Sequence, residues 1–145
     1  MLLTELLHPG ILEALAGAGH GARVLLTDGH YPASTAIGPR ARTVHLNLSP
    51  GVLPVPPVLD VLLRAVAVES AQVMAGPAGE PEPPAVAGYR AALAPAPVEA
   101  LGRFAFYDAA RSPDLALAIV TADTRTYANL LLTIGVRTEG SLTAP

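Results

Sequence analysis

Three side chains able to exchange protons or accept hydrogen bonds surround one short apolar segment near the start of the chain. His20 precedes the segment 23–27, and Asp28 and His30 follow it. Imidazole ordinarily exchanges its proton close to neutral pH, and a carboxylate accepts hydrogen bonds from hydroxyl groups. The packing of an apolar segment requires none of these residues, so all three are candidates for chemistry.

Each of these residues also has a structural interpretation. His20 at the end of a helix would interact favourably with the helix dipole and stabilise the helix by about 0.3–1 kcal/mol. Asp28 could cap the turn that follows it, and His30 could line a loop. A metal ion held by all three is a further alternative, although the seven residues between His20 and Asp28 do not match the short spacing of histidine metal motifs.

A second polar cluster, Thr126–Asn129, lies between two apolar segments near the other end of the chain. The phenol of Tyr127 and the amide of Asn129 together donate and accept hydrogen bonds, which suits a ligand with several hydroxyl groups. The same residues could equally form a turn with a surface tyrosine. Their spacing leaves both interpretations open.

The composition excludes several kinds of chemistry. The chain has no cysteine, which removes disulfides, thiolate nucleophiles and zinc-thiolate sites. All nine cationic residues are arginine, so a lysine Schiff base and a P-loop lysine are also excluded. The net charge is −3 and the arginines are scattered, so we expect no nucleic-acid partner. Catalysis must therefore use His, Asp, Glu, Tyr, Arg or hydroxyl groups.

The 145 residues suit a single domain, 1–145, with a sizeable core. No apolar run reaches the roughly 18 residues of a membrane-spanning helix. The first residues also lack the basic start and cleavage pattern of a signal peptide. We therefore expect a cytoplasmic protein with no membrane partner.

Hydrophobic periodicity indicates that helices and strands alternate along the chain, which predicts the α/β class. Asp28 would then lie at the carboxyl end of a strand, where open α/β sheets bind ligands. Residues 104–110 could form either a strand or a helix. The expected helices are 2–16 and 58–66, and the expected strands are 24–27, 43–48, 68–75, 115–121 and 129–136.

The segment 76–97 is rich in proline and is predicted to be a surface insertion rather than a domain boundary. Within it, residues 85–93 can form two helical turns after the prolines at 83 and 84.

Three segments together resemble the D-ribose pyranase and L-fucose mutarotase family. They are AGHGARVLLTDGHYPA at 18–33, RFAFYDAAR at 103–111 and YANLLLTIGV at 127–136. They follow the family's order and span nearly the whole chain. The resemblance implies a three-layer α/β/α domain with a mostly parallel, mixed sheet, and a homo-oligomer with pockets near the subunit contacts.

The resemblance also implies a mechanism without cofactor or metal, in which a reducing sugar opens and recloses its ring. His20 matches the family's general acid/base, which exchanges protons with the ring oxygen and the anomeric hydroxyl. The residues that match sugar-contacting positions are Asp28, Arg103, Tyr127, Ala128 and Asn129.

Different segments of the sequence resemble different branches of the family, and these branches act on different sugars. Segments 29–33 and 103–107 look like fucose mutarotases, whereas residues 44–63 look more like ribose pyranases. We therefore expect a monosaccharide substrate, L-fucose or a similar sugar, with D-ribose as the alternative. Two other classes remain open: a non-catalytic sugar-binding module of a transport system, and a metal-dependent sugar enzyme that uses His20, His30 and Asp28.

Overall fold

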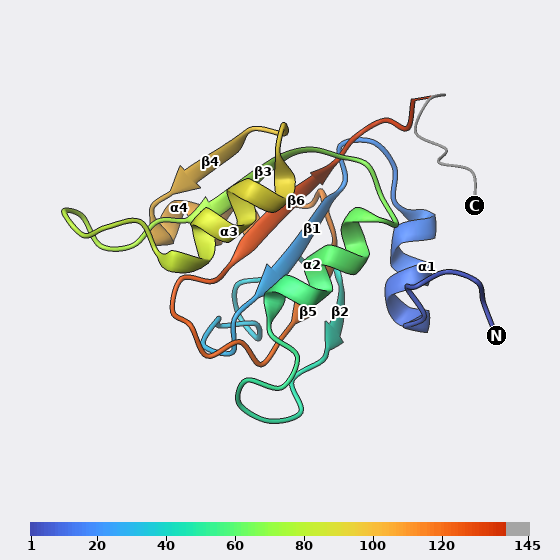
Figure 1. Ribbon diagram of the computed structural model, residues 1–145, viewed down its shortest axis with the longest axis horizontal. Coiled ribbons are helices and arrows are strands. Elements are labelled where there is room, and N and C mark those ends of the chain that lie inside the picture. Colours follow the sequence, from blue (N-terminus) through green and yellow to red (C-terminus); the bar gives the residue numbers. More distant parts are fainter. Residues whose placement is uncertain (139–145) are drawn as a thin grey trace.

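The apolar segments form one six-stranded sheet in the computed structural model, which describes residues 1–138 (Figure 1). The order across the sheet is β2-β5-β1-β6-β3-β4. β1 and β2 run parallel to β5, β3 runs parallel to β4, and β6 is antiparallel to both β1 and β3. The sheet is thus mixed and mostly parallel, as expected. The strands are β1 (Arg23–Thr27), β2 (Arg42–His45), β3 (Val68–Met74), β4 (Val98–Leu101), β5 (Leu115–Val120) and β6 (Leu130–Ile134).

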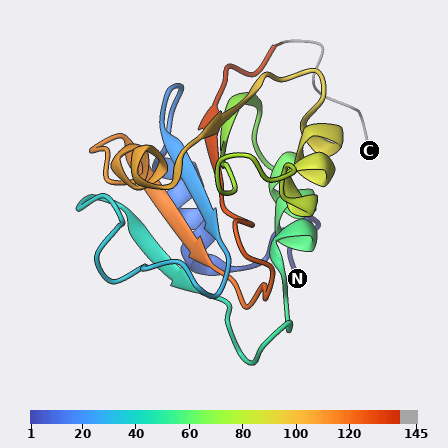
Figure 2. The same ribbon diagram turned by 90° about the vertical axis from the view of Figure 1, so that its left-hand side faces the viewer.

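Helices cover both faces of this sheet, which confirms the three-layer α/β/α architecture. Figure 2 shows α2 and α3 on one side and α4 on the other. Successive side chains of β1 point to opposite faces of the sheet. Val24 and Leu26 belong to the core shared with α1, α2 and α3, whereas Leu25 belongs to the core shared with α4. The helices are α1 (Pro9–Gly17), α2 (Val55–Leu63), α3 (Pro84–Leu93) and α4 (Arg103–Ala110).

Proline positions explain where several helices begin. α1 begins at Pro9 and not at residue 2, because proline suits the first helical turn and Nδ1 of His8 accepts a hydrogen bond from the Ile11 amide at 3.4 Å. α2 begins at Val55 with prolines in its first turn, three residues earlier than expected. The ambiguous segment 104–110 is helical, as part of α4.

The helical turns expected at 85–93 are present, but the structure differs from the expectation that the segment 76–97 is a surface insertion. Its second half forms α3, and the side chains of Val86 and Tyr89 lie in the main core with 0% and 2% exposure. β4, a strand that periodicity did not indicate, follows α3 and pairs with β3. Prolines that look like a linker in the sequence occupy the start of a buried helix, and the loop residues of this segment are 76–83 and 94–97.

The single domain, 1–145, stays a prediction, because residues 139–145 lie outside the described part of the chain. Among residues 1–138, no helix is long and apolar enough to cross a membrane.

Strand polarity brings one set of polar residues to a single edge of the sheet. Thr27 at the end of β1 pairs with Val120 at the end of β5, and Met74 at the end of β3 pairs with Leu101 at the end of β4. β6 enters the same edge in the opposite direction, because Leu130 pairs with both β1 and β3. Residues that follow β1 and β4, or precede β6, therefore meet at this edge.

Substitution of Tyr89 tests whether α3 belongs to the core. Because Tyr89 is buried, we expect Tyr89→Ala to lower the free energy of unfolding by about 3–5 kcal/mol, as large-to-small aromatic substitutions in cores do. The control is Glu80→Ala in the exposed loop, for which we expect a change within about 0.5 kcal/mol. Urea denaturation of both variants measures the difference, and equal stabilities would contradict a structural role for α3.

Candidate functional site

A buried carboxylate and amide join the end of β1 to the start of β6. Asp28 and Asn129 are 2% and 3% exposed. The backbone N–H of Asp28 donates to Oδ1 of Asn129 at 2.9 Å, and Nδ2 of Asn129 donates back to Oδ2 of Asp28 at 2.9 Å. This reciprocal pair fixes both side chains at the ligand-binding edge of the sheet.

Two backbone amides complete the surroundings of the Asp28 carboxylate. The His30 N–H donates to Oδ1 at 2.9 Å, and the Ala128 N–H donates to Oδ2 at 3.2 Å. Burial raises the pKa of Asp28, while these two amides, the charge of His30 and the Asn129 amide act in the lowering direction. With two lone pairs on each oxygen, Oδ1 retains one acceptor position. Asp28 can therefore accept one hydroxyl group from a ligand.

The carboxylate opens into a small pocket of about 180 Å³. Sites for drug-sized ligands span roughly 300–1,000 Å³, so this pocket suits one small ring. Four of the residues expected to contact a ligand meet here, and Ala128 contributes its N–H to Asp28. The lining residues are Asp28, His30, Tyr31, Met74, Arg103, Tyr107, Thr126, Tyr127 and Asn129.

α4 supplies the cationic and aromatic wall of the pocket. Arg103 is the first residue of α4, and its guanidinium lies 5.2 Å from the ring centre of Phe104. Within residues 1–138 it makes no hydrogen bond or ion pair, so its donors are available to a ligand. Tyr107, one turn later, packs edge-to-face on Tyr31, whose hydroxyl donates to the Ala36 carbonyl.

The backbone of Tyr127 adopts a left-handed conformation, with φ of 60°. A non-glycine residue in this region costs of the order of 1 kcal/mol or more, so neighbouring contacts must hold it there. The hydrogen bond from the Ala128 N–H to Asp28 does so on one side. The strain therefore belongs to the same arrangement that presents Tyr127 to the pocket.

His20 lies at the opposite end of β1. Five extended residues, each rising about 3.3 Å, separate the start of β1 from Asp28, or about 16 Å. Nε2 of His20 is 2.8 Å from Oε2 of Glu69 at the start of β3, and both side chains are exposed. One copy of the chain therefore does not bring His20 into the Asp28 pocket.

The separation of His20 from the Asp28 pocket also affects the alternative of a metal site. Among residues 1–138, no three His, Asp or Glu side chains are close enough to hold a metal ion. The set His20, His30 and Asp28 is not assembled within one copy.

Sequence patterns did not single out Met74 and Tyr107, which also line the pocket. Met74 ends β3, and Nδ2 of Asn129 lies 3.9 Å from its sulfur. Tyr107 could have been found once residues 103–110 were recognised as helical, since positions four apart share one face of a helix. Met74 could not, because the pairing of β3 with β6 is a long-range feature.

A second buried carboxylate, Asp123, stabilises the loop that carries the site. Arg125 donates to its two oxygens at 2.9 and 2.6 Å, and the Val55 amide at the start of α2 donates to Oδ2 at 3.1 Å. Burial alone would raise the pKa of Asp123, but the hydrogen bonds from Arg125 and Val55 hold this pKa below its usual value. Asp123 thus ties the loop between β5 and β6 to α2.

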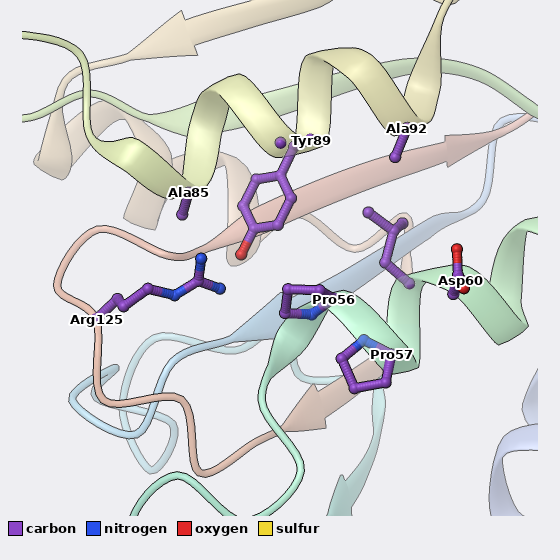
Figure 3. Close-up of a pocket in the computed structure, with 9 residues that line it drawn as sticks. Pro56, Pro57, Asp60, Ala85, Tyr89, Ala92 and Arg125 are labelled. Atoms are coloured by element: carbon purple, nitrogen blue, oxygen red, sulfur yellow. The ribbon is translucent and has the colours of Figure 1, made fainter.

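A larger pocket of about 420 Å³ lies between α2 and α3 (Figure 3). Prolines 56 and 57, small side chains of α3 and the ring of Tyr89 line it, and Arg125 extends toward that ring. The guanidinium is already paired with Asp123. The Tyr89 hydroxyl donates to the Ala128 carbonyl at 3.0 Å, so Tyr89 contacts the same backbone segment that donates to Asp28. Convergent polar groups favour the smaller pocket as the ligand site.

Comparisons with known proteins agree with this architecture. A model of the RbsD / FucU transport protein family matches residues 1–137. RbsD of Bacillus subtilis complexed with D-ribose has a TM-score of 0.80 and 22% identity, over 95% of this chain and 100% of that chain. Fucose mutarotase from Streptococcus pneumoniae in complex with L-fucose has a TM-score of 0.72 and 24% identity, over 90% and 94%. FucU from Bifidobacterium longum has a TM-score of 0.71 and 27% identity, also over 90% and 94%.

Replacement of Asp123 by asparagine tests the support of the site. We expect Asp123→Asn to lower the free energy of unfolding at pH 7 by about 2–4 kcal/mol, because it removes charge-assisted hydrogen bonds from Arg125 and Val55. The folded-state pKa of Asp123 is lowered, so its stabilisation is present above the ordinary carboxyl pKa and is lost as pH falls through the folded-state value. Thermal denaturation from pH 7 to pH 2 should show the two proteins converging in acid; a constant difference would contradict this assignment.

Proposed function

Because the chain belongs to the RbsD / FucU transport protein family, we propose that it is a monosaccharide mutarotase that interconverts the anomers of L-fucose or a similar reducing sugar. The observation that carries the proposal is the pocket at the carboxyl end of β1, where Asp28, Arg103 and Tyr127 converge on a space for one small ring. Two similar structures, one complexed with D-ribose and the other with L-fucose, support a sugar ligand.

The pocket groups suit the hydroxyls of a sugar in complementary ways. Asp28 offers its remaining acceptor position, and Arg103 offers free donors in a rigid fork. The side chain of Asn129 is bound to Asp28, so in this proposal Asn129 positions the carboxylate and leaves one acceptor position of its own. Tyr127 and Tyr107 present phenol rings at the pocket wall.

Anomer exchange requires two proton transfers. A base removes the proton of the anomeric hydroxyl, the bond from the anomeric carbon to the ring oxygen breaks, and an acid protonates that oxygen. Reclosure on the other face of the carbonyl reverses both transfers. The sum needs neither oxidant nor cofactor, so the proposed enzyme is a cofactor-independent isomerase. His20 is proposed as one of the two proton carriers.

The position of His20 implies that the working site contains two copies of the chain. His20 is exposed, is paired with the exposed Glu69, and precedes the start of β1, which itself lies about 16 Å from Asp28. It can reach a sugar held by Asp28 only if the His20 end of one copy meets the pocket of another. The proposed homo-oligomer is therefore part of the catalytic proposal.

Arg103 should determine the preferred sugar. We expect faster anomer exchange for L-fucose than pyranose/furanose exchange for D-ribose, because Arg103 belongs to the segment 103–107 that looks like fucose mutarotases. Its guanidinium can hold sugar hydroxyls in a geometry that a histidine at this position could not reproduce. Arg103→His should slow the L-fucose reaction by about 10- to 100-fold, the effect of one charge-assisted hydrogen bond of about 1.5–3 kcal/mol. Saturation-difference NMR with both sugars measures these rates, with the exposed Arg40→His as the control.

Three results would change the assignment, and a fourth would change only the role of Arg103. Faster exchange of D-ribose by the wild type would make the protein a ribose pyranase. Binding without exchange would make it a sugar-binding module, and exchange lost with EDTA and restored by metal would make it a metal-dependent enzyme. Equal slowing of both sugars by Arg103→His would remove Arg103 from sugar selection.

Mixed oligomers test whether two copies share a site. His20→Ala and Asp28→Asn should each lower exchange by at least about 10²-fold. When the two variants are co-expressed with different tags and co-purified, about a quarter of the pockets regain both native residues if each pocket combines two copies. Exchange should then return to about a quarter of the wild-type rate. No recovery in a verified mixed oligomer would place both residues in the same copy's site, contrary to the geometry above.

A further inference from the structure

His30 is the one imidazole that a single copy brings to the Asp28 pocket, within the described residues. Its backbone N–H donates to Oδ1 of Asp28 at 2.9 Å, which fixes the start of its side chain beside the carboxylate. His30 also lines a neighbouring cavity of about 320 Å³ with Thr124. His30 therefore stands on the wall between two open spaces and is exposed to solvent.

The contact with Thr124 determines which ring nitrogen is free. Nε2 of His30 lies 3.3 Å from the Thr124 carbonyl oxygen. A carbonyl only accepts, so a hydrogen bond here requires the proton of a neutral ring to be on Nε2. Nδ1 then carries the lone pair. Among residues 1–138, no partner occupies Nδ1, so this nitrogen is available to a ligand.

The other side chains of the pocket are poorly suited to exchange protons near neutral pH. Arg103 does not release its proton. The Asp28 carboxylate is occupied by three N–H donors, and burial raises the pKa of Tyr31, whose hydroxyl already donates to Ala36. Phenol groups in general hold their protons well above neutrality. Histidine is the exception, because its proton exchanges near pH 7.

We propose that His30 is a second proton-transfer residue of this pocket, with Nδ1 taking the proton of the anomeric hydroxyl. The inference rests on the proposed function, which needs one base and one acid. Neutral His30 accepts the hydroxyl proton as the ring bond breaks, and protonated His20 of another copy gives a proton to the ring oxygen. On reclosure, His30 returns its proton to the carbonyl oxygen and His20 takes the one on the former ring oxygen, so protons balance over each turnover.

Several charged or titratable groups face His30 and enter its pH dependence. The groups that line the two cavities beside His30 are Asp28, Tyr31, Arg103, Tyr107, Tyr127 and Asp123.

The test compares His30→Gln with the wild type as assembled oligomers. Glutamine can still donate to the Thr124 carbonyl but cannot carry a proton, and the backbone bond to Asp28 is kept. We expect kcat for L-fucose exchange to fall by about 10²- to 10⁴-fold with KM changed by less than about threefold. One limb of the pH profile of kcat/KM should also disappear. The control is His45→Gln, an exposed histidine at the end of β2 outside the pocket lining.

Two further measurements separate proton transfer from a structural role. Free imidazole should restore part of the exchange rate in His30→Ala, because residue 30 lines two open cavities that imidazole could enter. Long-range ¹H–¹⁵N correlation spectra of the wild type should show His30 with Nε2 protonated and Nδ1 unprotonated at high pH.

The outcomes distinguish this inference from the proposed function. If His30→Gln keeps kcat within about threefold and both limbs of the pH profile, or changes only KM, His30 does not transfer protons while the mutarotase proposal stands. If the wild type exchanges neither L-fucose nor D-ribose, the proposed function fails and the role of His30 fails with it.

Discussion

The reciprocal hydrogen bonds between Asp28 and Asn129 are the constraint on which the site depends. Burying a carboxylate costs free energy unless hydrogen bonds compensate, and here three N–H groups surround it. Two of these donors belong to Ala128 and Asn129, just before β6, and one to His30, just after β1. The carboxylate thus joins both chain segments that form the pocket. Any movement of one segment would leave a buried charge unsatisfied.

The position of β6, antiparallel and between β1 and β3, explains why Asp28 and Asn129 can form these hydrogen bonds. In a wholly parallel sheet, the residue after one strand meets residues that follow its neighbours. Here β6 starts where β1 and β3 end, so Asn129 faces Asp28 and Met74 across the sheet. β1 pairs with β5 on one side and β6 on the other, which makes the end of β1 a point where connections diverge. Ligands in open α/β sheets bind at such points.

Local patterns predicted the α/β class and part of this site, whereas the three-layer architecture with a mixed sheet was implied by the resemblance. The short apolar segment before Asp28 indicates a strand, and strand polarity places Asp28 at the ligand-binding edge. The core position of α3 was not predictable, because its prolines suit both a linker and the first turn of a helix. The partnership of Asp28 with Asn129 joins residues 101 positions apart, and only the pairing of β1 with β6 determines it.

Strand geometry also limits what the resemblance alone suggests about His20. A residue before a five-residue strand and a residue after it lie at opposite edges of the sheet, whatever the family. A pocket that uses both His20 and Asp28 must therefore be built from two copies, and its activity would depend on assembly. His30 is subject to no such limit, because the same turn that satisfies the Asp28 carboxylate places His30 in the lining of the pocket. The acid and the base of the proposed reaction would thus have different origins, one fixed by a local turn and the other supplied by an interface.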